Sequence, residues 1–532
     1  MVSPRAAGNA DAGWRGVKLV ARRPLLGGIL PAIVAGLAGL QTSRAAAQDP
    51  PASPPATPIP PRPGKSIWRS FYLGTRVWGY ADKHSVDAGE AFNLMLSTGP
   101  DRASVRGTIE IYRIGHHPEQ PVPDRKLVWR SPGVTVSQQP VEITAAAIGA
   151  GWPAGLEDIA TDGWRSGYYA LDFVDDIDAN RDRNVASIVV TNKARHDTAK
   201  RGDILLLLST NTWQAYNEWG GYSFYSSDFI GSAAQALTFD RPTPPEFFEY
   251  EYFTCLWLEK LASERGWSVD YATNFDIHRD PAFTETYRLL ISGSHNEYWS
   301  LAEFKAMHRR IFDLGRNTMF LGADAAYWQI RYADVNQGSD PQTRGRQLIC
   351  FKSADDPNFW RPSPTPKDAQ ITTLFREDGR WPETMLTGVA YQGWFGQDRD
   401  PLPAYPYYAV NTDFAFFAGT GYRPGDPIGD LAGYEWDNRD PEGDGRRLWS
   451  ATASHIPAID PAAIQVLFQG KTVDVDGRPG LAEAVYFRSP AGGKVFTAGS
   501  IRWAWGLGKP GFAQAPFQLF NAQLVADFLR EN

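Results

Sequence analysis

Residues 203–209 read DILLLLS, an unbroken apolar run bounded by an aspartate and a serine. A strand covered on one face alternates apolar and polar side chains, whereas a strand buried on both faces is apolar throughout. The run therefore predicts an inner strand of a parallel sheet. Two later segments of similar composition, YRLLISG at 287–293 and NTMFLGA at 317–323, predict further strands of the same sheet.

Helical patterns separate these strands. FTCLWLEKLASERG (253–266) and SLAEFKAMHRRIFDLG (300–315) have helical spacing and end in glycine. Ser300 is suited to begin the second helix and Gly315 to end it. The segment WSVDYAT follows the first helix and predicts another strand. Strand and helix alternate, which indicates an open parallel α/β domain.

The chain before this domain has a different pattern. Short runs rich in β-branched and aromatic residues are separated by Gly, Pro and Asp; they are AFNLMLST, GTIEIYRIG, GYYALDFV and ASIVVTN. Runs of this length and spacing predict an antiparallel β-sandwich over residues 67–197. The α/β domain then spans residues 198–532, with an irregular insertion at about 340–450 that is rich in Pro, Gly and Asp.

The first 47 residues have the composition of an export signal. Arg22 and Arg23 precede a weakly apolar stretch that ends at Leu40, and small residues follow up to Ala47. This order predicts a twin-arginine signal peptide cleaved near Ala47, and hence a periplasmic or secreted protein without a stable membrane span. A short membrane anchor is the alternative. Residues 48–66 are rich in proline and predict an extended linker.

Composition excludes several classes of protein. The formal charge of −7 over 532 residues argues against a nucleic-acid-binding surface. Cys255 and Cys350 are the only cysteines, so a disulfide-rich scaffold and a cysteine zinc site are both excluded, while one disulfide remains open. The 19 tryptophans fit either a packed β-rich core or an aromatic surface for sugars.

Polar and aromatic side chains gather where the predicted strands end. The three segments are TNTWQAYNEWGGYSFY, SGSHNEYWS and GADAAYW, at 210–225, 292–300 and 322–328. Ligands of open α/β sheets bind at the carboxyl ends of the strands, so these loops predict one site. His295 and Glu297 are two residues apart and point the same way if the strand continues through Glu297.

Common catalytic motifs are missing from these segments. There is no HExxH, CxxC or GxSxG pattern in this region. Asp276 and His278, in FDIHRD, also follow a strand; they either close a loop or contact a metal directly.

Five stretches together resemble the large subunit of the N,N-dimethylformamidase family: GYADKHSVDAGEAF, TWQAYNEWGGYSFY, SGSHNEYWS, FLGADAAYW and GYEWD. The sheet with its turn at FLGADAAYW also resembles class I glutamine amidotransferases, which have a cysteine where this chain has Ala323 and Asp324. The resemblance implies a sandwich followed by an amidotransferase-like domain. It implies hydrolysis of a small amide at a mononuclear ferric ion, and a small partner subunit; a homo-oligomer is also open.

The resemblance also implies the ligands of the iron. Tyr216 matches one tyrosinate ligand and Glu297 the carboxylate ligand. The second tyrosine is expected at the end of the sandwich, where Tyr169 is preferred to Tyr168. Phenolate and carboxylate are hard oxygen donors, which suit a trivalent iron. Without the resemblance, Tyr216 would be taken as a packed aromatic residue.

Other residues are expected to assist the reaction. The resemblance assigns a catalytic role to His295 and Glu435, although a histidine at a strand end is commonly structural and Glu435 could be a solvated loop carboxylate. The polar and aromatic residues expected to contact substrate are Trp213, Asn217, Trp219 and Asn296.

Two other functions remain possible from the sequence. One is a carbohydrate- or envelope-binding protein without catalytic activity. The other is a glycoside hydrolase that uses Glu297 and Glu435, which requires carboxyl groups about 5–9.5 Å apart across a sugar-sized cleft.

Overall fold

The structure is a computed structural model, and the residues it describes all belong to one compact unit. They are residues 76–142, 144–177, 180–192, 202–225, 233–242, 246–333, 345–353, 355–358, 370–377, 381–396, 402–440, 459 and 463–530. The predicted signal peptide, the proline-rich linker and the domain boundary near residue 197 lie outside the described residues.

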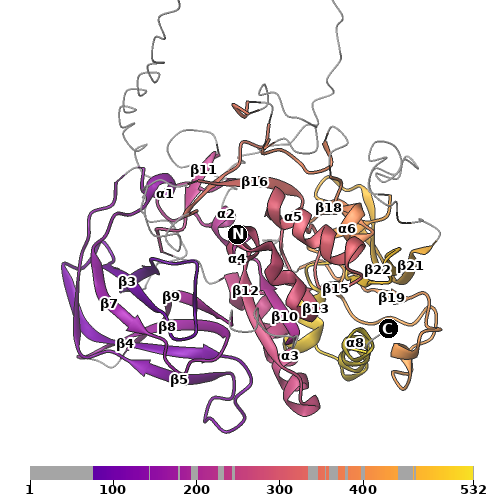
Figure 1. The fold of residues 1–532 in the computed structure, drawn as a ribbon, viewed down its shortest axis with the longest axis horizontal. Helices are drawn as coiled ribbons and strands as arrows, with labels where there is room; N and C mark the ends of the chain where they lie inside the picture. Colours follow the sequence, from indigo (N-terminus) through magenta and orange to yellow (C-terminus); the bar gives the residue numbers. More distant parts are fainter. Residues whose placement is uncertain are drawn as a thin grey trace, which may run out of the picture. The chain divides into compact units, whose positions relative to one another are not determined.

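Residues 76–192, called here the N-terminal β region, form two sheets (Figure 1). The smaller has the strand order β1-β3-β7 and the larger the order β2-β9-β8-β4-β5, with β6 paired to β4. The strands are β1 Val77–Ala81, β2 Ser85–Asp87, β3 Ala91–Thr98, β4 Ser104–Ile114, β5 Arg125–Arg130, β6 Val134–Ser137, β7 Ala154–Ala160, β8 Gly167–Asp175 and β9 Arg181–Thr191. Both sheets contribute to one buried core that includes Leu94, Ile111 and Val190. The pairings are antiparallel, as predicted, except that β2 pairs with β9 in parallel.

The largest sheet has eight strands in the order β12-β10-β13-β15-β23-β22-β21-β19. They are β10 Gly202–Leu208, β12 Val269–Thr273, β13 Tyr287–Ser292, β15 Asn317–Phe320, β19 Tyr408–Ala409, β21 Gln465–Val473, β22 Pro479–Arg488 and β23 Lys494–Thr497. The apolar run that predicts an inner strand is β10, which pairs in parallel with β12 and β13 and is buried from Ile204 to Leu208.

The expectation of a wholly parallel sheet is wrong for its last three strands. The first five strands are parallel, but β22, β21 and β19 pair antiparallel with their neighbours. For β22 and β23 the cause is the short turn after Arg488, where the Ser489 carbonyl accepts a bond from the Gly492 amide, and a second short turn at Asp474–Arg478 joins β21 to β22. A turn this short can only join antiparallel strands, whereas parallel strands need a long crossover.

The helices of the described residues are α1 Ala145–Ile148, α2 Thr210–Tyr216, α3 Glu251–Arg265, α4 Asn274–Arg279, α5 Leu301–His308, α6 Thr384–Thr387, α7 Trp503–Gly508 and α8 Ala515–Phe528. Helices α3 and α5 correspond to the segments predicted to be helical at 253–266 and 300–315. Gly266 ends α3 in the left-handed conformation, at φ +70°. Ser300 begins α5 with a capping box shared with Glu303. The α-helical part of α5 is shorter than predicted, because residues Arg309–Asp313 form a π-helical turn before Gly315.

The predicted irregular insertion contains short paired strands. A four-stranded sheet has the order β11-β17-β16-β14, and a two-stranded sheet joins β18 to β20. The strands are β11 Ala236–Thr238, β14 Tyr298–Ser300, β16 Trp328–Ala333, β17 Gln347–Ile349, β18 Ala390–Trp394 and β20 Glu435–Asn438. Segments before and within the insertion therefore fold as one sheet.

The N-terminal β region and the α/β region share a core. Ile114 and Tyr168 of the β region belong to the same buried cluster as Leu206 and Trp213. Arg113 of β4 and Glu259 of α3 form an ion pair of 2.6 Å with side chains that are 5% and 10% exposed. The two regions are therefore held together by apolar packing and by a buried charge pair.

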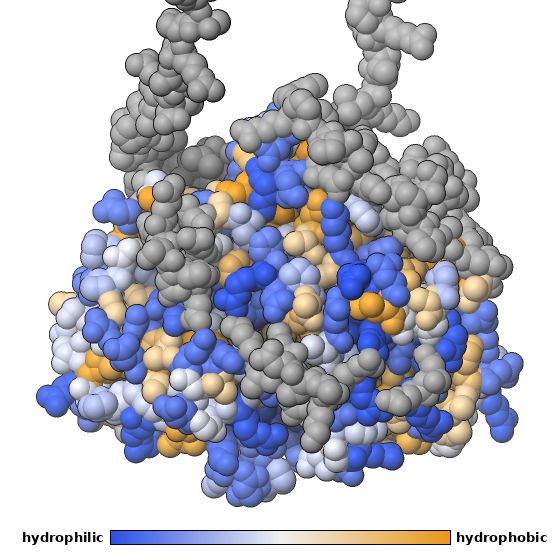
Figure 2. All heavy atoms as spheres, in the orientation of Figure 1, coloured by the Kyte–Doolittle hydropathy of each residue, from blue (hydrophilic) through white to orange (hydrophobic). Residues whose placement is uncertain are grey.

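The surface, the helices, the cysteines and the tryptophans can each be compared with what the composition predicts. On the face shown in Figure 2, apolar residues are interspersed with hydrophilic ones. None of the helices in the described ranges is long and apolar enough to cross a membrane. Cys255 and Cys350 are both buried and free, so no disulfide joins them. Ten of the tryptophans are buried, which favours packing as the reason for their number.

Candidate metal centre

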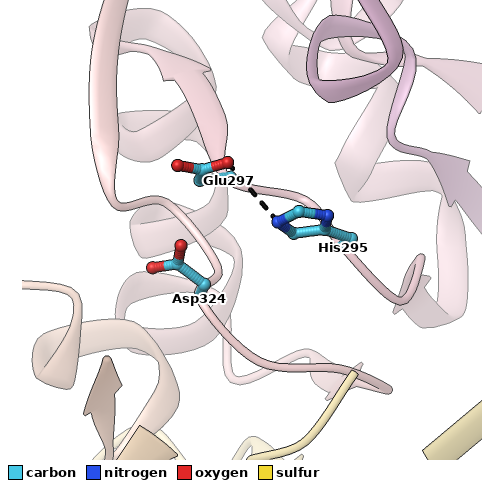
Figure 3. Close-up of side chains that lie close together, drawn as sticks. All are labelled: His295, Glu297 and Asp324. Atoms are coloured by element: carbon cyan, nitrogen blue, oxygen red, sulfur yellow. Dashed lines mark ion pairs between the residues drawn. The ribbon is translucent and has the colours of Figure 1, made fainter. Parts of the chain in front are cut away.

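His295, Glu297 and Asp324 form a buried cluster of possible ligand groups (Figure 3). One ligand atom from each lies within 4.8 Å of the others. His295 and Glu297 follow β13, and Asp324 follows β15, so the cluster lies at the carboxyl ends of two adjacent parallel strands. An isolated parallel bridge between His295 and Ala323 extends the pairing beyond both strands. The sheet itself therefore sets the distance between the two loops.

The sequence predicts that His295 and Glu297 point the same way if the strand continues through Glu297, but the strand ends before this residue. Strand β13 ends at Ser292, and Glu297 directly precedes β14. The two side chains still meet, with His295 Nε2 3.4 Å from Glu297 Oε2. The Glu297 amide donates to Thr212 Oγ1 of α2 at 3.0 Å, which fixes the backbone of Glu297 against that helix.

Two phenol groups donate to the carboxylate of Glu297. The Tyr216 hydroxyl, from the last residue of α2, lies 3.1 Å from Oε2, and the Tyr225 hydroxyl lies 2.6 Å from Oε1. The two rings stack with centroids 4.4 Å apart. Tyr225 is 44% exposed, yet burial of its hydroxyl raises the pKa of this phenol well above 10. The ring therefore marks the accessible side of the cluster while its oxygen lies inside.

Tyr169 does not join this cluster. Its hydroxyl donates to the carbonyl of Arg165 at 2.6 Å, and its ring stacks on Trp164 with centroids 4.7 Å apart. Tyr168 also packs internally, with its ring stacked on Phe247. The second phenol beside Glu297 is Tyr225, which sequence reasoning missed although it lies nine residues after Tyr216 in the same loop.

Glu435 and Tyr434 approach His295 from the predicted insertion. Glu435 Oε2 lies 3.3 Å from His295 Nε2, and the Tyr434 hydroxyl lies 3.3 Å from Nδ1. Burial alone lowers the pKa of His295, but the carboxylates of Glu435 and Glu297 outweigh it and raise the pKa to about 10. In the absence of a bound cation the imidazole is therefore protonated at neutral pH. Burial raises the pKa of Glu435, although His295 opposes the shift.

Asp324 is held in an unusual backbone conformation at the turn after β15. Its φ is +56°, a region that non-glycine residues rarely adopt and that is often found at functional turns. The side chain is 3% exposed, and burial together with Glu297 and Glu435 raises its pKa well above the ordinary value. Sequence analysis placed Asp324 at the turn where a related fold carries a cysteine, but assigned it no role.

Three buried atoms of this cluster lack a hydrogen-bond partner among the described residues. They are His295 Nε2, Asp324 Oδ1 and Glu435 Oε2. The two short distances from His295 Nε2 to carboxylate oxygens are within range for ion pairs but lack hydrogen-bond geometry. Buried polar atoms in proteins nearly always have a hydrogen-bond partner, so three atoms without one at the same place favour a ligand or an ion bound among them.

The four residues expected to contact substrate have internal partners. Asn217 donates to Gln214 Oε1 and the Pro242 carbonyl, and Trp219 packs edge-on against Trp152. Asn296 donates to Ser292 Oγ within the core. Trp213 packs against Tyr168 and lines a separate hollow together with residues such as His84 and Gln214. These contacts position α2 and the loop after β13 and lie apart from the carboxylate cluster.

Asp276 and His278 make contacts that close a loop, which is one of the two alternatives, loop closure or direct metal contact, left open by the sequence. Asp276 completes a capping box with Thr273 at the start of α4 and also accepts from Ser85 at 2.6 Å. His278 Nδ1 lies 2.8 Å from Ser300 Oγ, the residue that begins α5.

Comparison with known families gives one match. The model of a family described as N,N-dimethylformamidase beta subunit-like, C-terminal, matches residues 108–515. The match covers more than half of the chain and includes every residue of the carboxylate cluster. No curated protein was found to match the chain.

Proposed function

The chain belongs to the N,N-dimethylformamidase beta subunit-like family, and from this we propose that it is a metal-dependent hydrolase of a small carboxamide. The family suggests an amide hydrolase. The metal, its ligands and the substrate are our inference from the side chains around Glu297.

One observation carries the proposal: a buried carboxylate that accepts two phenol hydroxyls. Glu297 is 2% exposed and receives Tyr216 and Tyr225 on its two oxygens, at 3.1 and 2.6 Å. Two phenols and a carboxylate form a set of three hard oxygen donors, which is the chemistry that Fe(III) prefers. The unpaired atoms of His295, Asp324 and Glu435 supply polar surroundings for a cation and its substrate. These residues fit a mononuclear ferric ion, with Tyr216, Tyr225 and Glu297 as its ligands.

A ferric ion at this position would act as a Lewis acid toward an amide carbonyl and would make a water molecule more acidic. Glu435 is suited to act as a general base, because burial raises the pKa of its carboxyl and its Oε2 lacks a hydrogen-bond partner among the described residues. It takes a proton from the attacking water and returns it to the departing amine.

His295 and Asp324 stabilise negative charge in this scheme. His295 presents Nε2 to the same space as Glu435, and when this nitrogen carries a proton it donates to the oxygen of the substrate carbonyl as charge develops on it. Burial and the neighbouring carboxylates of Glu297 and Glu435 raise the pKa of Asp324, which favours a protonated carboxyl that can donate a hydrogen bond beside them.

A second ligand set must be distinguished from this one. His295, Glu297 and Asp324 also offer one nitrogen and two oxygens, a combination found in non-haem iron sites. We favour the phenol set because both hydroxyls already contact Glu297, whereas His295 Nε2 lies between two carboxylates. The same position of His295 disfavours a glycoside hydrolase, because the imidazole fills the space between Glu297 and Glu435 where a sugar would lie.

Metal analysis with a visible spectrum tests the proposal. We expect about one iron per chain and a tyrosinate-to-iron absorption band in the visible, with release of amine from small formamides and acetamides. Tyr216→Phe and Glu297→Gln are expected to lose the band and the bound iron. Colourless, metal-free protein that still hydrolyses amides would contradict the proposal, and iron without a visible band would favour the His295 set.

Export and a partner complete the proposal. The paired arginines and the weakly apolar segment before Ala47 support export to the periplasm or beyond. The description of the family as subunit-like supports a small partner chain. Size measurement of the purified protein, together with identification of any small chain that copurifies with it, distinguishes a complex from a homo-oligomer.

A further inference from the structure

Lys352, which is half-buried, places its ammonium group on the aromatic ring of Tyr225. Its Nζ lies 3.5 Å from the centroid of this ring, 4.8 Å from that of Trp328 and 5.2 Å from that of Tyr298. A cation within about 6 Å of a ring centroid is attracted by the electrons of the ring face. Three rings around one ammonium form an aromatic cage, and one of its walls is a proposed metal ligand.

The sheet beside the metal centre builds this cage. Tyr298 of β14 and Trp328 of β16 are direct partners in a parallel pair, so their side chains lie next to each other. Strand β17 pairs with β16 on its other side and leads, after Ile349, to Lys352. The Tyr298 hydroxyl also donates to the Tyr225 hydroxyl at 2.7 Å. The cage thus touches Tyr225 at its ring face and at its oxygen.

The backbone of Lys352 is fixed in a rarely adopted conformation. Its φ is +56°, which side chains with a Cβ avoid unless their surroundings hold them there. The Lys352 amide donates to the Thr372 carbonyl at 2.8 Å, and the Phe351 amide donates to Thr372 Oγ1 at 2.8 Å. Two bonds to one residue hold the loop, and the unusual φ directs the side chain toward the cage.

The ammonium of Lys352 interacts electrostatically with carboxyl groups of the candidate metal centre. Burial lowers the pKa of this ammonium, while Glu297, Asp324 and Glu435 oppose the shift. All three are acidic groups of the candidate metal centre. Lys352 thus supplies positive charge to a cluster that is otherwise rich in carboxylates.

We propose that Lys352 is the positioning residue of Tyr225, holding its phenol against Glu297 and setting the electron density of this ligand. The first part stands on the contacts alone, whereas the second rests on the proposed iron site. A positive charge on the ring face stabilises the electrons of a phenolate. In iron-loaded protein it therefore increases the energy needed to move an electron from tyrosinate to iron.

Lys352→Met tests the proposal, because methionine keeps much of the length of the side chain and removes its charge. In metal-free protein with 2-fluorotyrosine incorporated at position 225, we expect the ¹⁹F NMR signal to shift. In iron-loaded protein we expect the visible band to move to longer wavelength. We also expect kcat to fall about tenfold, or ~1.4 kcal/mol, with little change in KM. Lys352→Arg retains the charge and is expected to restore most of the ¹⁹F position and the band.

Lys509→Met is the matched control. Lys509 Nζ also stacks on an aromatic ring, 3.3 Å from the centroid of Trp505, but its ion-pair partner is Glu249, outside the cluster. The control should leave the ¹⁹F signal, the band and kcat as they are in the wild type.

The outcomes separate this inference from the proposed function. If Lys352→Met changes only thermal stability and leaves the ¹⁹F signal and the band unchanged, the positioning role is overturned. If the wild-type protein binds no iron, the proposed function fails, while the ¹⁹F signal of metal-free protein still decides whether Lys352 positions Tyr225.

Discussion

Glu297 gathers the residues on which the proposed chemistry depends. Sequence reasoning named four members of this group, Tyr216, His295, Glu297 and Glu435, from the family resemblance, and the structure brings them together. It missed Tyr225, because the second tyrosine was sought at the end of the β region. A contact between two side chains of one loop depends on how that loop closes, which local patterns in the sequence do not encode.

Tyr225→Phe and Tyr169→Phe distinguish the two candidates for the second phenol ligand. Tyr225→Phe removes the oxygen 2.6 Å from Glu297 and should weaken the visible band and lower iron affinity at least about tenfold, or ~1.4 kcal/mol. Tyr169→Phe removes a hydroxyl bonded to the Arg165 carbonyl and should leave both unchanged. Chelator competition followed by absorbance provides the measurement, and the opposite order of effects would restore Tyr169 as the ligand.

Glu435→Gln should separate catalysis from metal binding. The amide cannot take a proton, so kcat is expected to fall about 10²- to 10⁴-fold, the usual contribution of a general base. Iron content and the visible band should persist, since the hydroxyls of Tyr216 and Tyr225 donate to Glu297 and not to Glu435. A variant that loses its iron together with its activity would make Glu435 a ligand instead.

At the scale of elements, sequence patterns predicted strands and helices better than their arrangement. Strands β10, β13 and β15 and helices α3 and α5 lie close to their expected positions because apolar periodicity and terminal Ser or Gly residues are local signals. The antiparallel addition of β22, β21 and β19 depends on a turn and on long-range pairing. Strand β17, which leads to Lys352, lies in the segment that was expected to be irregular, because a strand of three residues leaves little periodicity to detect.

Helix α5 makes a prediction about pH. Burial raises the pKa of Glu303 in its capping box to about 8, although bonds from Ser300 and Asn274 oppose the shift. The folded protein then keeps a proton that the unfolded chain releases near pH 4.5, so the stability contributed by this group is present below that pH and is lost as pH rises through 8. The loss amounts to on the order of 5 kcal/mol at 1.36 kcal/mol per pKa unit.

Glu303→Gln tests this dependence, because glutamine also serves in a capping box but does not titrate. The free energy of unfolding is measured with denaturant at several pH values. As pH rises from 5 to about 8.5, the wild type should lose unfolding free energy relative to the variant. Glu264→Gln on the exposed side of α3 is the control and should run parallel to the wild type over that range. A parallel curve for Glu303→Gln would show that this carboxyl is ionised in the folded protein.

At the scale of the whole molecule, the described residues of the β region and the α/β region belong to one compact unit. Their shared core and the Arg113–Glu259 pair cross a boundary that composition alone placed between two domains. Composition shows where one pattern ends and another begins, but it does not report how much apolar surface the two parts bury against each other. The degree of coupling therefore needed the structure.

Arg113→Met measures the coupling through the buried pair. It leaves the Glu259 carboxylate buried without its main counter-charge, which is expected to cost about 3–5 kcal/mol of unfolding free energy. Arg106 lies on β4, like Arg113, and forms an exposed ion pair with Asp176. Arg106→Met removes this pair and should lower the unfolding free energy by less than about 1 kcal/mol. The double variant Arg113→Met with Glu259→Met should recover much of the loss; an unrecovered loss would place the effect in packing.

The bridge between His295 and Ala323 bears on how this scaffold can diversify. The bridge pairs the backbone of His295 with that of Ala323, the residue before Asp324. The sheet therefore fixes the spacing of the His295 and Asp324 side chains. Insertions and deletions in more distant segments can then alter which molecules reach the cluster without altering the distance between its acids. Relatives with very different loops could thus share one reaction while accepting different amides.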